Sequence, residues 1–229
     1  MSTSTSRFEG FGPGTFEFLS ELGICNNKPW FEAHRDEFEA EVMRPARAFV
    51  VALGEALRPT FGGIVADPRT DRSIFRLHRD TRFSKDKSPF KSHLGMLLWE
   101  GDRPKMECSG FYIHLEPGRV MLGAGLYMIP RELLPAYRVA VASEAGRGLL
   151  EAVAAVEATG AVVDGASTKR VPAGWPADLP QSGLLKRTGL YAWVESEPDA
   201  TVATPSFVQA TAARLTAMAP IHRWLVANL

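Results

Sequence analysis

Apolar side chains at helical spacing organise the first quarter of the chain. They recur every three or four positions from Pro13 to Leu22, and again from Trp30 to Val42, which predicts two amphipathic helices. Asn26 and Asn27 interrupt the pattern between them and are typical helix caps. Pro45 then predicts a kink or a restart before the helical pattern continues to residue 57.

The pattern changes toward strands between Ile64 and Tyr127. Short runs rich in Ile, Phe, Tyr, Leu and Val are separated by Gly, Pro and charged residues. The expected strands are 73–79, 94–99, 110–116 and 119–127. The turn Glu116-Pro117-Gly118-Arg119 has Pro and Gly at its central positions, which is typical of a type II turn and predicts an antiparallel hairpin.

Helical periodicity returns after Pro130. It predicts helices over 131–143 and 147–158, a proline-containing loop over 164–183 and a strand over 190–195. Thr204-Pro205 has the order of a helix cap followed by proline, so a C-terminal helix should begin there. Pro220 should break that helix near its end.

These elements predict an α+β fold in one domain. An antiparallel sheet, formed by about residues 64–127 plus 190–195, should be flanked by N-terminal, middle and C-terminal helices. The domain should span residues 8–229. Residues 1–7 are small and polar, without apolar periodicity, and are expected to be disordered.

Composition narrows the class of protein further. Lys and Arg together number 26, and so do Asp and Glu, which argues against a general nucleic-acid-binding protein. No apolar run is long enough to cross a membrane, and the N-terminus lacks the apolar segment of a secretory signal. Cys25 and Cys108 are widely spaced, so both are expected to be reduced thiols in a cytoplasmic protein.

The run from Ser73 to His93, SIFRLHRDTRFSKDKSPFKSH, concentrates positive charge in this neutral chain. If 73–79 is a strand, Arg79 shares a face with Phe75 and Leu77, so it should be partly buried. A buried guanidinium needs a carboxylate or a bound anion. Asp67, Asp80 and Asp86 are the candidate partners.

Two interpretations of this run are open. It can be a phosphate- or carboxylate-binding loop, or a structural network of ion pairs. The first interpretation gives these ligand-binding residues: Arg76, Arg79, Arg82, Ser84, Lys85, Lys87, Lys91 and, from a second basic group, Lys169 and Arg170.

Tyr112 and His114 are the candidate catalytic residues. They share a face of the predicted hairpin, which Arg76 and His78 can also reach from the neighbouring strand. His114 is the better acid–base candidate, because the ordinary pKa of histidine is near neutrality. Gly123 and Gly125 should leave either a shelf for a ligand beside this face or room for a closely packed helix.

Metal and nucleotide sites are not expected. The histidines show no HxxxH or HxH spacing, and no CxxC occurs. There is no Walker loop, and the glycines of 10–14 lack the preceding strand that a dinucleotide fingerprint requires. No metal or nucleotide motif is therefore found, and the sequence leaves the cofactor unknown.

Several motifs occur together and in order: FEGF at Phe8, NNKPWFEAHRDEF at Asn26, the basic run, GFYIHLEPG at Gly110 and KRVPAGW at Lys169. In this combination the chain resembles the bacterial and fungal family of conserved hypothetical proteins called domain of unknown function 2461. The resemblance covers nearly the whole chain and implies a single domain without an established activity. His34, His78 and Leu179 depart from the family pattern, where Asn, Tyr and His are more usual.

Two functions of different classes follow. The first is an enzyme or sensor that binds a small phosphorylated or carboxylated ligand through the basic run. The second is a non-enzymatic module that docks an acidic protein partner or nucleic acid. Basic side chains that converge favour the first, and basic side chains spread over a convex face favour the second.

Overall fold

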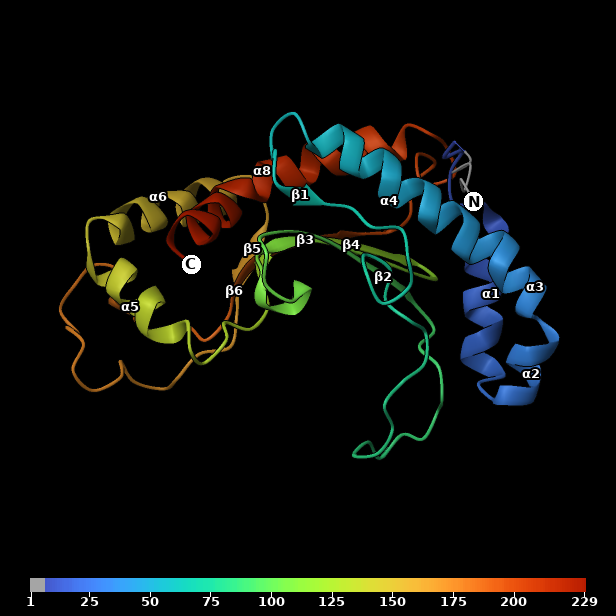
Figure 1. Ribbon diagram of the computed structural model, residues 1–229, viewed down its shortest axis with the longest axis horizontal. Helices are drawn as coiled ribbons and strands as arrows, with labels where there is room; N and C mark the ends of the chain where they lie inside the picture. Colours follow the sequence, from blue (N-terminus) through green and yellow to red (C-terminus); the bar gives the residue numbers. More distant parts are fainter. Residues whose placement is uncertain (1–6) are drawn as a thin grey trace. The chain divides into compact units, whose positions relative to one another are not determined.

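The computed structural model describes residues 7–229 and confirms the α+β class (Figure 1). Six strands form one antiparallel sheet in the order β1-β2-β3-β4-β6-β5. Apart from Arg7, the segment predicted to be disordered lies outside the described residues. Within the described residues, no helix is both long enough and apolar enough to span a membrane.

Four helical segments follow one another in the N-terminal region. They are α1 (Pro13–Ile24), α2 (Lys28–Ala33), α3 (Arg35–Glu37) and α4 (Arg44–Leu57), with a π-helical segment, η1 (Phe38–Met43), before α4. The side chain of Asn27 caps α2 by accepting a hydrogen bond from the Trp30 amide at 3.0 Å, as the sequence predicts.

Pro45 accounts for the irregular segment before α4. A proline has no amide hydrogen for the carbonyl four residues earlier, and its ring clashes with that carbonyl in a regular α-helix. The carbonyl at that position belongs to Glu41, and it accepts a hydrogen bond from the Thr15 hydroxyl at 2.6 Å instead. The restart predicted at Pro45 is therefore a π-helical turn whose open carbonyl is satisfied by α1.

The central strands agree with the predicted ones. They are β2 (Leu94–Glu100), β3 (Gly110–Glu116) and β4 (Arg119–Leu126), and β1 is only Ile64–Val65. Gly118 has a φ of +77°, the left-handed conformation that a type II turn requires at this position.

The prediction of a strand over 73–79 is wrong. This segment makes isolated bridges only, from Ile74 to Thr70 and Met96 and from His78 to Phe90. Hydrogen bonds from the Phe75 amide to Gly95 and from the Leu97 amide to Ser73 hold it beside β2. From Leu77 to Arg79 its backbone hydrogen bonds go to residues 89–91 instead, so no continuous ladder with β2 forms.

The rest of the chain supplies further elements. They are η2 (Lys105–Glu107), α5 (Leu134–Ala142), α6 (Ala145–Glu157), β5 (Val162–Asp164), α7 (Ser182–Leu185), β6 (Leu190–Ser196) and α8 (Phe207–Asn228). The predicted helices, the loop and the β6 strand are confirmed within a few residues.

Pro220 does not end the C-terminal helix, contrary to the prediction. It lies inside α8, which continues to Asn228. Its neighbours Ala219, Ile221 and His222 are all completely buried. Burial of this face of the helix therefore offsets the hydrogen bond that proline cannot donate.

Two compact units can be distinguished along the chain. Among the described residues, the first contains 7–98, 112–121 and 195–212, and the second contains 99–111, 122–194 and 213–229. The expectation of one domain over residues 8–229 stays a prediction.

The FEGF motif forms part of the core of the first unit. Phe8, Phe11, Phe49 and Phe207 contact one another, with ring centroids 5.0 to 6.1 Å apart. The Phe11 amide donates a hydrogen bond to the carbonyl of Val202 at 2.8 Å. This aromatic cluster ties the N-terminal segment to the segment before α8.

The second unit has its own core. Tyr137 and Leu149 are completely buried, from α5 and α6. The Tyr137 hydroxyl donates a hydrogen bond to the Leu184 carbonyl at 3.0 Å, and the Trp224 ring nitrogen donates one to the Ala145 carbonyl at 2.7 Å. Both polar atoms of these aromatic residues are thus satisfied.

Candidate functional site

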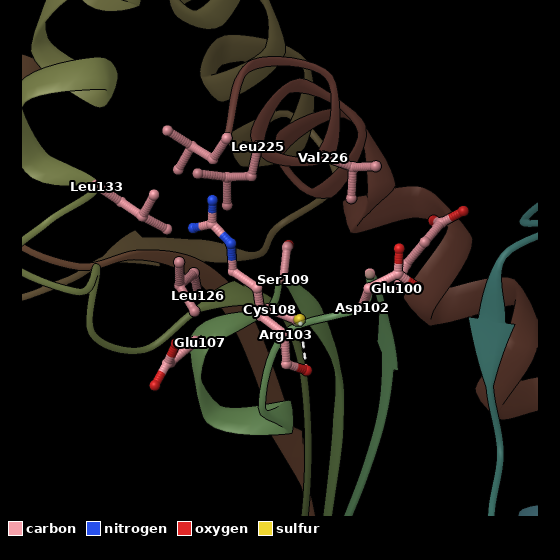
Figure 2. Close-up of a pocket in the computed structure, with 12 residues that line it drawn as sticks. Glu100, Asp102, Arg103, Glu107, Cys108, Ser109, Leu126, Leu133, Leu225 and Val226 are labelled. Carbon is pink, nitrogen blue, oxygen red and sulfur yellow. Dashed lines mark hydrogen bonds between the residues drawn. The ribbon is translucent and has the colours of Figure 1, made fainter.

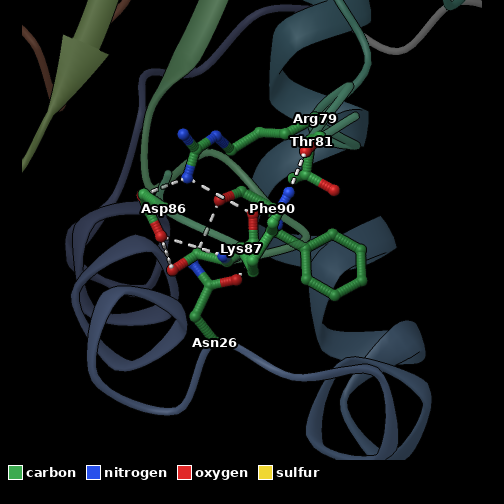
Figure 3. A network of polar contacts seen from close by, with 7 residues as sticks. Asn26, Arg79, Thr81, Asp86, Lys87 and Phe90 are labelled. Atoms are coloured by element: carbon green, nitrogen blue, oxygen red, sulfur yellow. Dashed lines mark hydrogen bonds and ion pairs between the residues drawn. The ribbon is translucent and has the colours of Figure 1, made fainter. Parts of the chain in front are cut away.

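The basic run forms a loop in the first unit, and backbone hydrogen bonds join the two ends of this loop. The Arg79 amide donates to the Pro89 carbonyl and the Lys91 amide to the Leu77 carbonyl, both at 2.8 Å. The side chain of Asn26 binds the Phe90 backbone twice, donating to its carbonyl and accepting from its amide, each at 3.0 Å (Figure 3). Asn26 therefore anchors the base of the loop to the junction of α1 and α2.

Much of the charge within this loop is already paired (Figure 3). Arg79 forms an ion pair with Asp86, and Arg82 forms one with Asp80 at 2.7 Å. Lys87 donates to the Thr81 carbonyl at 2.9 Å. The tip of the loop therefore agrees with the interpretation of the basic run as a structural network of ion pairs.

Arg79 pairs with Asp86, one of its predicted partners, and its side chain is partly buried. Its side chain is 26% exposed, whereas that of Asp86 is 59% exposed. Hydrogen bonds from the hydroxyl and the amide of Ser88, and then from Arg79, hold the pKa of Asp86 well below its usual range. An ion pair this open to solvent contributes little to stability.

Lys91 differs from the other lysines of the run. It is half-buried, and its amine lies 5.7 Å from the centre of the Phe75 ring. Burial lowers the pKa of Lys91, and the positive charges of Arg76 and Arg79 lower it further, against the opposing charge of Asp71. Among the described residues, no carboxylate lies within ion-pair distance of its amine.

The other predicted ligand-binding residues are placed as follows. Arg76 and Lys85 are exposed, and Ser84 is half-buried with its amide bonded to the Thr81 carbonyl at 3.3 Å. Lys169 and Arg170 are exposed and belong to the second unit.

Tyr112, His114 and Glu116 form a cluster with His93, also in the first unit. Tyr112, His114 and Glu116 are two residues apart in β3, so their side chains lie on the same face of the strand. His93 directly precedes β2. The Tyr112 hydroxyl lies 3.2 Å from His114 Nδ1, and His114 Nε2 lies 3.3 Å from Glu116 Oε2. The rings of His93 and His114 are stacked with centroids 4.3 Å apart.

Arg119 closes the cluster at the hairpin turn. It lies 3.1 Å from Glu116 Oε1 and 2.7 Å from Glu195 Oε2, so it bridges two carboxylates. Burial favours the neutral form of Glu116, but the hydrogen bond from Arg119 and the nearby imidazole of His114 outweigh it and leave the pKa of Glu116 lowered.

The two histidines of this cluster differ in exposure. His114 is 7% exposed, whereas His93 is half-buried. Burial, and then the charges of His114 and Lys91, lower the pKa of His93 to about 4, so His93 is neutral at physiological pH. Burial raises the pKa of Tyr112 to about 12, which keeps its hydroxyl protonated.

The predicted surroundings of Tyr112 and His114 need two corrections. Phe75, rather than Arg76, lies against Tyr112, with ring centroids 6.2 Å apart, because 73–79 is not a regular strand. Gly123 and Gly125 leave no shelf. A Cβ at Gly123 would lie 3.2 Å from the Ala192 carbonyl oxygen, and one at Gly125 would lie 2.5 Å from the Leu190 carbonyl oxygen. Strand β6, and not a helix or a ligand, takes this space.

His93 and Glu116 were missed by the search for metal-ligand spacing. The expected ligand spacings join residues close together in one segment, whereas His93, His114 and Glu116 come from two segments. The available signal was the H-x-E pattern at His114 and Glu116, because residues two apart in a strand share a face. His93 joins them only through the pairing of β2 with β3. The ligand atoms of the three side chains lie within 4.8 Å of one another.

A separate cavity of about 220 Å³ lies in the second unit (Figure 2). Leu126, Leu133 and Leu225 line it together with Ser109 and Glu100. Arg103 and Cys108 also line it, and the Cys108 thiol donates to the Arg103 carbonyl at 3.4 Å. No residue of the basic run contributes to this cavity.

His222 connects two residues of the cavity wall. Ser109 Oγ lies 2.9 Å from His222 Nδ1, and His222 Nε2 lies 3.0 Å from Glu100 Oε2. A hydroxyl, an imidazole and a carboxylate in this order also occur in acyl-transfer enzymes. Here the imidazole is completely buried and Ser109 is only 5% exposed. We therefore interpret the three residues as a buried polar bridge between α8 and the chain around η2.

The sequence comparison agrees with the resemblance of the motifs. Residues 14–224 match the family described as "Conserved hypothetical protein (DUF2461)". No curated protein matches the sequence. The match covers most of the chain, including the basic run, the β2–β3 cluster and most of the residues that line the cavity, so the chain belongs to the DUF2461 family of conserved hypothetical proteins.

Proposed function

We propose that the protein binds a small phosphorylated or carboxylated ligand at Lys91, with Arg76 and Arg79 beside it. The observation that supports this is the half-buried amine of Lys91, which has two arginines nearby and no ion-paired carboxylate among the described residues. Partial burial makes such a charge costly, and like charges add to the cost. A bound anion would remove both penalties.

The chemistry of the three cations suits this ligand class. Arg76 is exposed and forms no ion pair with any of the described residues, so its planar guanidinium is available for two parallel hydrogen bonds to an anion. Arg79 is held in place by Asp86 and by the Ser88 carbonyl at 3.3 Å. A fixed arginine, an available arginine and a partly desolvated lysine together favour an anion over a cation or a neutral ligand.

Catalysis at this site would use the neighbouring histidines. The positive charge of Lys91 contributes to the low pKa of His93, which is neutral at physiological pH. A neutral, half-buried imidazole can accept a hydrogen bond from a bound ligand, and a pKa of about 4 makes it a weak base. His114 and Tyr112, the candidates from the sequence, would then orient His93 and the ligand, because His114 is nearly inaccessible.

A thermal-shift experiment tests the proposal. Inorganic phosphate and a panel of phosphorylated and carboxylated metabolites are added to the metal-free protein in the presence of chelator. At least one anion should raise Tm, since a ligand that binds only the native state stabilises it by about 2.7 kcal/mol at a hundredfold excess over Kd.

Variants assign the effect to the site. Lys91→Met and Arg76→Ala should keep the fold and lose the rise in Tm. Lys28→Met is the matched control, because Lys28 is exposed on α2 and its removal changes the net charge equally. An equal rise in the Lys91→Met, Arg76→Ala and control variants, or no rise with any anion, would reject the proposed site.

One observation favours a second function, docking of an acidic protein partner by the loop tip. Phe83 is 95% exposed there, and the guanidinium of Arg82 lies 5.8 Å from the centre of its ring. An exposed aromatic ring beside basic residues is typical of an interaction surface. Phe83→Ala should leave the anion-induced rise in Tm unchanged if the anion binds at Lys91, and should reduce capture of acidic partner proteins if the tip docks them.

A further inference from the structure

We propose that His93, His114 and Glu116 bind a divalent transition-metal ion of the zinc class. This inference goes beyond anion binding and does not depend on it. It rests on the position of three ligating side chains, on an unpartnered buried nitrogen, and on the residues that hold these ligands from behind.

The unpartnered nitrogen is His114 Nε2. His114 is 7% exposed, and this atom has no hydrogen-bond partner although Glu116 Oε2 lies only 3.3 Å away. A buried polar atom without a partner is unusual in a native protein and requires an explanation. A metal ion between the imidazole and the carboxylate supplies one, since it would accept a lone pair from both.

Neighbouring residues hold His114 and Glu116 in the protonation state and orientation that metal binding requires. Tyr112 lies against Nδ1 of His114, so a proton on Nδ1 can be donated to the tyrosine oxygen while Nε2 keeps its lone pair. Arg119 occupies Oε1 of Glu116 and leaves Oε2 facing His114. Hydrogen-bonded histidine and carboxylate ligands of this kind are general in metal sites.

The remaining ligand, His93, completes the set. The ligand atoms lie within 4.8 Å of one another. In a tetrahedral zinc site with bonds of about 2.1 Å, ligand atoms are about 3.4 Å apart, so the cluster would contract by roughly 1.4 Å at its widest. His93 and Glu116 are only half-buried, so their side chains have room to make this adjustment.

Two histidines and one carboxylate leave a coordination position open. That number of protein ligands is typical of catalytic zinc sites, where water or substrate takes the fourth position, whereas structural sites are usually closed by four protein ligands. The charge of Arg119 is shared between Glu116 and Glu195, which lies 2.7 Å away, and Lys91 places a further positive charge near His93.

Direct titration tests the site. The full chain is stripped with chelator, dialysed, and titrated with Zn²⁺ against a chromophoric chelator, and Co²⁺ is added in parallel to record its visible spectrum. One equivalent of Zn²⁺ should bind, and Co²⁺ should give the intense visible bands of four-coordinate geometry.

Variants locate the ion. His93→Ala and Glu116→Gln should weaken Zn²⁺ binding by more than the roughly 10–100-fold that loss of a supporting residue costs, and Tyr112→Phe should weaken it within that range. His78→Ala is the matched control, because His78 is exposed and lies outside the cluster. Circular dichroism and Tm of the stripped variants show that each one folds.

The proposal is overturned if the stripped protein binds no Zn²⁺, or if His93→Ala and Glu116→Gln bind it as tightly as His78→Ala does. Because the anion test uses chelated protein, either experiment can fail without the other.

Discussion

His222→Ala should lower the free energy of unfolding by about 3 kcal/mol or more at pH 7.5. The substitution removes a completely buried ring that contacts Ser109 and Glu100 through its two nitrogens. It leaves a cavity and takes a hydrogen-bond partner from each of two polar groups. Urea unfolding of the variant and the parent protein measures the loss.

The cost of His222→Ala should also depend on pH. Burial lowers the pKa of His222, and Glu100 offsets this only in part. The unfolded chain therefore takes up a proton near the ordinary pKa of about 6.5, and the native protein takes it up only at a lower pH. The native protein loses this contribution as pH falls below about 6.5, so the cost of the substitution should be smaller at pH 5.5 than at pH 7.5.

Two comparisons separate this bridge from general effects of histidine and from catalysis. His78→Ala, at an exposed position, should change stability by only about 0.5 kcal/mol. Ser109 should not react with a serine-directed fluorophosphonate. Labelling of Ser109, together with an undiminished stability of His222→Ala, would contradict the structural role and point to a nucleophile.

Gly10→Ala should be nearly as damaging, with an expected loss of about 3 kcal/mol. Gly10 has a φ of +123°, a conformation that side chains other than glycine rarely adopt. A Cβ at this position would overlap the carbonyl group of Ala203, and the overlapping atoms belong to backbone that cannot rotate away. Equilibrium unfolding in urea gives the difference.

Gly12→Ala is the matched control, because a Cβ there would meet nothing within 4 Å and its φ of −69° suits any residue. It should be neutral, or stabilising by about 0.4–1 kcal/mol through the unfolded chain. Equal stability of the two variants would show that the close approach of residues 10 and 203 does not hold the aromatic cluster together.

Features set by local sequence were predictable. Asn27 caps α2 and Gly118 takes the left-handed turn position, because each depends only on neighbouring residues. The extent of α8 was not predictable at Pro220, since burial of the flanking residues outweighs the local cost of proline. The segment 73–79 has strand composition, but its hydrogen bonds are divided between a loop and β2.

In the candidate site too, features that depend on local sequence were predictable and those that depend on long-range contacts were not. The motif identified Lys91 and Arg76, and it identified Arg79 with Asp86 among its possible partners. It could not tell which of these charges is paired, because that depends on how the loop folds back onto residues 89–91. His93 joins His114 and Glu116 only when β2 pairs with β3, which no spacing rule within one segment can reveal.

The central claim is that Lys91 is a partly buried cation that binds an anion. Measuring the pKa of Lys91 tests this claim most directly. The pKa of Lys91 can be measured by NMR of lysine labelled at the side chain, with Lys91→Met identifying the signal. The account predicts a pKa below the ordinary value of about 10.4 in anion-free buffer, and a rise when inorganic phosphate or the most stabilising anion is added. An ordinary pKa that no anion changes would contradict it.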